Sequence, residues 1–219
     1  MFWGEIMEKE LEQYIVDNII KWGEENRDNF PWRNPDTVYE SIVAEIMLIR
    51  TPPEQVLSVY NEFIESFPDF ENLNKTGYNV VNKYIKKIGL NWRTELLINM
   101  SDYVVNELNG EIKPEIKKLV KIPGLGEYTA SAVLIYYFKK RAVPIDSNTI
   151  RFINRYFDRS LKRRQKELKS IYDNLVPDNV DKSVIFNESF LDFMRKVCTV
   201  HNPECNNCPI SQKCKYYNN

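Results

Sequence analysis

Residues 119–138 read LVKIPGLGEYTASAVLIYYF and, after the basic link KKRA, residues 143–155 read VPIDSNTIRFINR. Pro123, Gly124 and Gly126 interrupt two helical patterns, which predicts a short helix, a tight hairpin and a second helix beginning near Tyr128. Both glycines permit a positive φ and leave the backbone N–H groups uncovered. A nest of such groups at a helix N-terminus binds an anion such as phosphate. The alternative is an ordinary turn between two helices.

A carboxylate one helix further along the chain favours the anion site over the ordinary turn. Asp146 stands directly before the helical pattern that contains Ile150, where an aspartate serves as an N-cap. The positive end of that helix favours the ionised carboxylate. Asp146 is therefore predicted to cap the helix and to offer a fixed negative charge.

The motifs Ile122–Gly126, Tyr128–Ala130 and Asp146 together resemble the helix-hairpin-helix DNA glycosylases, and the similarity runs from about Arg27 to the C-terminus. Within that superfamily the chain is similar to the iron–sulfur branch, which includes endonuclease III, the MutY adenine glycosylases and the archaeal mismatch thymine glycosylases. Three segments look closest to the last group: FPWR (30–33), EIMLIRT (45–51) and VPIDSN (143–148).

The resemblance implies roles for the hairpin and for the residues around Asp146. The hairpin residues Gly124, Leu125 and Gly126 would grip one DNA phosphate. Asp146 would stabilise an oxocarbenium-like transition state at the sugar, by the logic of glycoside hydrolysis. Asn148 matches an asparagine of MutY-like relatives and would orient Asp146 or the attacking water, although a residue at a helix start needs no such role.

Glu45 is the only charge in the apolar run IVAEIMLI at residues 42–49. Its helical neighbours are apolar, and desolvation raises the pKa of a carboxyl group, which lets the group hold or deliver a proton near neutral pH. A buried glutamate paired with an arginine or a backbone N–H is the structural alternative. The resemblance favours a catalytic role, because MutY and the mismatch thymine enzymes place a base-contacting glutamate in this setting.

Tyr128 occupies the position at which endonuclease III and other bifunctional relatives carry a lysine. That lysine forms a Schiff base with the sugar, which a phenol cannot do. The resemblance therefore implies a monofunctional glycosylase without lyase activity, in which the ring of Tyr128 packs on the flipped base. Glu127 replaces the basic residue usual just after the hairpin, which weakens the expected attraction for phosphate.

Two short segments are candidates for entering the DNA duplex. By resemblance, Arg50 at the end of one predicted helix would fill the space that the flipped base leaves. Asn91 and Trp92, in the loop after Gly89, form the second candidate. Single charged or aromatic residues on loops are also typical of ordinary protein surface.

Four cysteines fall within the last 22 residues, spaced Cys198-x6-Cys205-x2-Cys208-x5-Cys214. In an intracellular chain such a cluster indicates metal rather than disulfides. Four thiolates suit structural zinc or an iron–sulfur cluster, and ligand softness does not separate the two. The resemblance selects a [4Fe–4S] cluster, because this spacing matches the C-terminal loop of the endonuclease III branch. His201 lies inside the loop and is predicted to face solvent.

The apolar spacing throughout is helical, and no convincing alternating strand is present, so the predicted class is all-α. Besides an N-terminal amphipathic helix, the pattern predicts helices at residues 37–49, 79–88, 94–108, 112–119 and 128–138, followed by three more before the cysteines. Thr51 is predicted as the N-cap of another helix, with Glu54 completing a capping box. By resemblance the fold has two lobes: a six-helix barrel at residues 28–139, and a helical cluster domain formed by residues 1–27 and 140–219.

Composition limits the remaining possibilities. The chain has 219 residues, 43% of them hydrophobic, and no apolar run of membrane-spanning length. Acidic residues near the N-terminus stand where a signal peptide would be basic, which predicts an intracellular, cytoplasmic protein. The net charge of −1 does not by itself predict a nucleic-acid partner. The one dense basic run, residues 159–169, is as typical of a solvated helix face as of a DNA contact.

The resemblance implies a monomeric, monofunctional DNA glycosylase that acts on double-stranded DNA and removes thymine or uracil mispaired with guanine. An adenine glycosylase acting opposite 8-oxoguanine or guanine is the nearest alternative. The chain ends five residues after Cys214, where MutY enzymes usually carry a further domain. A non-catalytic DNA- or protein-binding module and a zinc-stabilised helical scaffold are the alternatives from other classes.

Overall fold

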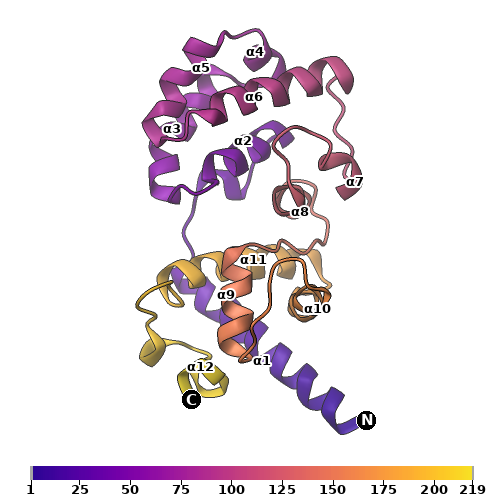
Figure 1. Ribbon diagram of the computed structural model, residues 1–219, viewed down its shortest axis with the longest axis vertical. Coiled ribbons are helices and arrows are strands. Elements are labelled where there is room, and N and C mark those ends of the chain that lie inside the picture. The colour runs from indigo at the N-terminus through magenta and orange to yellow at the C-terminus, as the bar shows by residue number, and fades with distance from the viewer. Residues whose placement is uncertain (1, 219) are drawn as a thin grey trace. The chain divides into compact units, whose positions relative to one another are not determined.

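The computed structural model describes the backbone of residues 2–218 and the side chains of residues 9–218. The described residues form helices and connecting turns and contain no strand, as the sequence predicts. None of these helices combines the length and the apolar composition that crossing a bilayer would need. The chain divides into two compact units, Asn29–Lys140 and the combination of Met1–Asp28 with Arg141–Asn219 (Figure 1).

The unit formed by Asn29–Lys140 is built around two apolar helices, α2 (Val38–Leu48) and α8 (Glu127–Tyr136), which pack against each other. Residues 41–47 of α2 and 129–136 of α8 are all buried, which is typical of helices surrounded by other elements. The surrounding helices are α3 (Pro53–Ser66), α4 (Phe70–Asn74), α5 (Tyr78–Ile85), α6 (Trp92–Asp102) and α7 (Ile116–Leu119). Two 3-10 turns lie at Pro31–Arg33 and Lys86–Ile88, and a π-helical turn at Tyr103–Glu107 continues α6.

The second unit joins the two ends of the chain. Its helices are α1 (Phe2–Asn26), α9 (Ser147–Tyr156), α10 (Lys166–Leu175), α11 (Val180–Lys196) and α12 (Lys215–Asn218), with short turns at Cys205–Asn207 and Ser211–Lys213. Helices α1 and α11 pack along each other, with the ring of Trp22 edge-on to Phe193 at 5.6 Å between centroids. Gly23 permits this approach, because a Cβ there would lie 1.9 Å from Oγ of Ser189.

Two predicted helix starts are wrong for physical reasons. Thr51 does not cap α3: that helix begins at Pro53, without a side-chain capping bond, and the hydroxyl of Thr51 instead accepts a hydrogen bond from Arg93 at 2.5 Å. The helix predicted for residues 112–119 is only the four-residue α7. Pro114 has no N–H to donate and disfavours helical geometry at Lys113, so the helix begins after it.

Candidate functional site

The hairpin between α7 and α8 depends on one glycine conformation. Gly124 has a φ of +88°, and a Cβ at this position would lie 2.9 Å from side-chain carbons of Leu96. Gly126 has a φ of −76°, so Gly124 alone of the two hairpin glycines uses the positive φ that both permit. A Cβ at Gly126 would meet nothing within 4 Å. Gly126 therefore leaves open space at the N-terminus of α8.

Leu125 holds the hairpin in place from inside. Its side chain is buried at 3% exposure, and its N–H donates to the carbonyl oxygen of Ile122 at 3.1 Å. The side chain of Leu125 is therefore part of the core. Any ligand contact at the hairpin falls to the backbone at the start of α8, where Gly126 is the N-cap residue and no side chain caps the helix.

Glu45 and Tyr128 lie on the two central helices of this unit. Glu45, in α2, is only 8% exposed and has buried Ile42 and Ile46 on the same helix. Tyr128 lies in the first turn of α8 and is half-buried. Because α2 and α8 pack together, the unit contributes an acidic and a phenolic side chain from neighbouring helices.

In the other unit, Asp146 is the N-cap of α9, as predicted. Its Oδ1 accepts a hydrogen bond from the backbone N–H of Thr149 at 2.9 Å, and Oγ1 of Thr149 accepts from the backbone N–H of Asp146 at 3.5 Å, which completes a capping box. Its Oδ2 accepts from Nδ2 of Asn148 at 2.7 Å. Donors at both oxygens fix the orientation of the carboxylate.

Arg151 binds Asn148 in turn and extends the hydrogen-bond network of Asp146. Its Nη2 donates to Oδ1 of Asn148 at 2.9 Å and to the carbonyl of Met194 at 3.0 Å, and its Nε donates to the carbonyl of Cys198 at 3.1 Å. Burial lowers the pKa of the Arg151 guanidinium, while the nearby Cys198 and Asp146 oppose that shift. A continuous line of hydrogen bonds therefore runs from Asp146 to the start of the cysteine segment.

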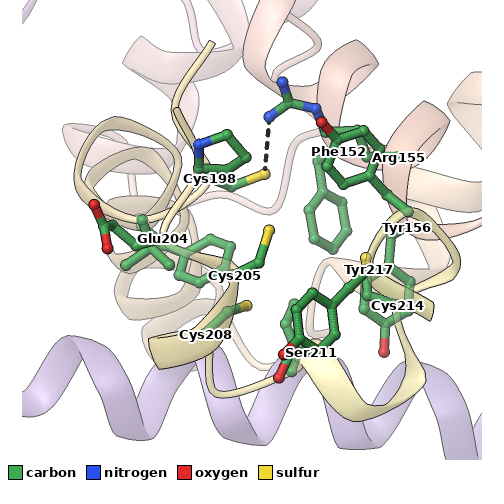
Figure 2. A pocket seen from close by; sticks show the side chains of 15 residues that line it. Phe152, Arg155, Tyr156, Cys198, Glu204, Cys205, Cys208, Ser211, Cys214 and Tyr217 are labelled. Atoms are coloured by element: carbon green, nitrogen blue, oxygen red, sulfur yellow. Dashed lines mark hydrogen bonds between the residues drawn. The ribbon is translucent and has the colours of Figure 1, made fainter. Parts of the chain in front are cut away.

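All four cysteines line one cavity (Figure 2). They are Cys198, Cys205, Cys208 and Cys214, and none is in a disulfide. Arg155 donates through Nη1 to Sγ of Cys198 at 3.6 Å (the dashed line in Figure 2), and to the carbonyl of Thr199 at 2.6 Å. His201, by contrast, is exposed.

Burial in this cavity favours the neutral form of the cysteine thiols in the absence of a metal. Burial, together with the neighbouring thiols, raises the pKa of Cys208 to about 11. Burial likewise raises the pKa of Cys205 and Cys214. Within the described residues, no three His, Cys, Asp or Glu side chains converge as a metal-ion site. Four sulfurs around one cavity, one of them facing an arginine, are nevertheless a donor set suited to a cluster.

The two predicted duplex-entering segments are exposed and lie in the same unit. Arg50 lies between α2 and α3 and has a left-handed backbone with φ +55°. Asn91 and Trp92 are also exposed, although Trp92 is the first residue of α6 rather than a loop residue. Sequence reasoning missed the buried Arg93, since an arginine beside an exposed tryptophan is typical of surface.

Comparison with known proteins places the chain in a family. Residues 43–177 match the model of the HhH-GPD superfamily of base excision DNA repair proteins. A thymine/uracil-DNA glycosylase of Methanothermobacter thermautotrophicus is 35% identical over 207 residues, covering 93% of both chains. A solved thermostable thymine-DNA glycosylase has a TM-score of 0.90 and 33% identity, covering 95% of this chain and 97% of that one. Endonuclease III in a non-covalent DNA complex shares the fold, with a TM-score of 0.82 at 19% identity, covering 96% of each chain.

The all-helical fold is that of a solved thymine-DNA glycosylase. This chain belongs to the HhH-GPD superfamily of base excision DNA repair proteins.

Proposed function

We propose that the chain is a monofunctional DNA glycosylase that releases thymine or uracil paired with guanine. The observation that carries the proposal is the 35% identity to a thymine/uracil-DNA glycosylase over nearly the whole of both chains. The reaction breaks the bond between C1′ and the base nitrogen. Water supplies a hydroxyl to C1′, the departing base takes up a proton, and an abasic site remains in an intact strand.

Asp146 is the proposed catalytic carboxylate. Cleavage of the glycosidic bond leaves positive charge on the sugar, and a fixed negative charge beside it stabilises that state. The bonds from Thr149 and Asn148 hold the carboxylate before the reaction begins, so that no reorganisation is needed. Asn148 is therefore a proposed positioning residue for Asp146.

Glu45 and Tyr128 are proposed to act on the extruded base. A flipped pyrimidine is bound through its polar edge and by stacking on aromatic rings. Glu45 supplies the carboxyl group that hydrogen-bonds the base or protonates it as it leaves, and Tyr128 supplies the ring. The backbone at Gly124, Leu125 and Gly126 is proposed to bind one phosphate at the N-terminus of α8. This phosphate belongs to the strand that carries the extruded base.

A duplex panel tests the substrate assignment. Duplexes carrying G·T, G·U, A opposite 8-oxoguanine, A·G and common damaged bases are incubated with the enzyme, then scored for breaks with and without alkali. Alkali-dependent breaks at G·T and G·U support the proposal. Cleavage confined to adenine would replace it with the MutY-type activity, and an inert protein that still binds DNA would indicate a non-catalytic module.

Replacing Tyr128 with lysine should add lyase chemistry. An amine at the start of α8 can attack C1′ and form a Schiff base, which a phenol cannot. Wild type should give no borohydride-trapped adduct and no strand nick before alkali. Tyr128→Lys should give a trapped covalent complex and some strand cleavage. Trapping by the wild-type enzyme would contradict the monofunctional assignment and direct attention to another amine, such as that of Lys139 or Lys140.

The four cysteines are proposed to hold one [4Fe–4S] cluster with a structural role. When bound, the cluster supplies a rigid link between the turns that carry the cysteines, while Arg155 donates to one of the sulfurs. Because Cys205, Cys208 and Cys214 have raised pKa values, assembly must displace protons, and acidification should favour loss of the cluster.

Protein purified without oxygen should be yellow-brown and contain about four irons per chain. Cys208→Ser should remove the visible absorbance and lower the melting temperature. Ser211→Ala, at another residue that lines the same cavity, should leave the absorbance and the melting temperature unchanged. One zinc per chain, with no broad visible absorption, would contradict the cluster assignment.

A further inference from the structure

Arg93, in the first turn of α6, is a fully buried cation with 0% exposure. In the described part of the chain, its hydrogen-bond acceptors include no carboxylate. Nη2 donates to the carbonyl of Ile49 and, at 2.5 Å, to Oγ1 of Thr51. Nη1 donates at 3.4 Å to the carbonyls of Ile88 and Gly89. Burying a charge without an opposite charge is costly, which calls for a reason specific to this position.

The acceptors belong to two segments that lie far apart in the sequence. Residues 49–51 lie in the connection between α2 and α3, and residues 88–91 lead from the turn at Lys86–Ile88 into α6. The planar guanidinium donates in several directions at once, so a single side chain can bond both segments. Arg93 therefore links two connections of the same unit through its own hydrogen bonds.

Each segment contains an exposed residue in the left-handed region. Arg50 has a φ of +55° and Leu90 a φ of +57°. Residues other than glycine are disfavoured there and persist where the surroundings determine the backbone. The carbonyls of Ile49 and Gly89 belong to the peptide units directly before Arg50 and Leu90. The same guanidinium thus binds the peptide unit that precedes each left-handed residue.

We propose that Arg93 is a positioning residue that holds the segments 49–51 and 88–91 together as one platform for the DNA duplex. The proposal rests on the proposed function. Arg93 never reaches DNA itself. It fixes the backbone from which Arg50, Leu90 and the neighbouring Trp92 project, so extrusion of the base depends on it while bond cleavage does not.

Arg93→Lys tests this idea, because lysine keeps the charge but cannot reproduce the planar set of donors. The single-turnover rate on a G·U duplex should fall about tenfold or more, as expected when misplacement arises away from the chemistry. The rate on uracil opposite a tetrahydrofuran abasic analogue, where no pair must be broken, should change less than about threefold. Amide hydrogen exchange at Thr51 and Gly89 should accelerate together.

Thr94→Val is the matched control, since Thr94 is the next residue and equally buried, and its hydroxyl donates to Oδ1 of Asn82 at 2.9 Å instead of to either segment. This variant should lower the stability of α6 but leave unchanged the ratio between the rate on G·U and the rate on uracil opposite the abasic analogue. Thr51→Val removes one acceptor of Arg93 and should give a smaller loss confined to G·U, which tests the idea even if Arg93→Lys does not fold.

Equal losses on both substrates, or a folded Arg93→Lys with unchanged rates, would overturn the proposal. A wild-type chain that released no base from any duplex would instead refute the proposed function. In that case, the exchange at Thr51 and Gly89 would still decide whether Arg93 couples the segments.

Discussion

Asp146→Asn should fold, bind duplex DNA and lose about 10³-fold of its single-turnover rate, the upper end of the effect of one electrostatic group on a transition state. Asparagine caps a helix as well as aspartate does, so Oδ1 can still accept from the N–H of Thr149. The charge that would stabilise the sugar is gone. The rate should be measured on G·U duplex with enzyme in excess, alongside the melting temperature and DNA affinity.

Thr149→Val separates capping from chemistry in this experiment. Thr149 is 1% exposed, and its hydroxyl accepts from the backbone N–H of Asp146 and donates to Oδ1 of Asp146 at 3.1 Å. In the variant, the backbone N–H of Thr149 and the amide of Asn148 still donate to the carboxylate. The variant should lose about 1 kcal/mol of unfolding free energy and retain most of its rate per folded molecule. If Asp146→Asn behaved in the same way, Asp146 would be a helix cap without a catalytic role.

Glu45→Gln should lower the single-turnover rate about 10²-fold or more, the usual scale for a residue that donates or accepts a proton. Glutamine keeps the shape of the glutamate side chain and one carbonyl oxygen, so the packing of side chains around α2 should change little. Because Glu45 is buried at 8% exposure, the loss would come from the acidic group itself rather than from a solvent-exposed charge.

Ser41→Ala is the matched change on the same helix, one turn before Glu45 and buried at 2% exposure. It should reduce stability slightly and leave the rate unchanged. A Glu45→Gln enzyme with a normal rate and a lowered melting temperature would assign Glu45 to the core. The same result would require another proton donor for the departing base.

Local patterns predicted the parts of the structure that depend on neighbouring residues. The capping role of Asp146 follows from an aspartate placed directly before an apolar helical repeat, and the hairpin follows from Pro123, Gly124 and Gly126. These signals lie within one helical turn of the feature they determine, so tertiary context has little room to change them.

Features that depend on distant residues could not be predicted in this way. Thr51 resembles an N-cap in sequence, but its hydroxyl is taken by Arg93, 42 positions later. Arg93 itself is a charged residue that sequence reasoning assigns to the surface. The residue types at positions 50 and 90 do not predict the positive φ of Arg50 and Leu90, because neither residue is a glycine or an asparagine.

The pairing of α1 with α11 has a consequence for how the chain acquires its structure during synthesis. Residues 29–140 form a contiguous unit, which can fold as soon as it has left the ribosome, because domains generally fold as units in N-terminal order. Helix α1 is synthesised before α11, which begins more than 150 residues later in the chain. Ile15 and Ile19 therefore stay uncovered until α11 has been synthesised. A chain broken off after residue 140 would therefore keep a foldable unit and expose the apolar face of α1, which makes such fragments targets for chaperones and proteases.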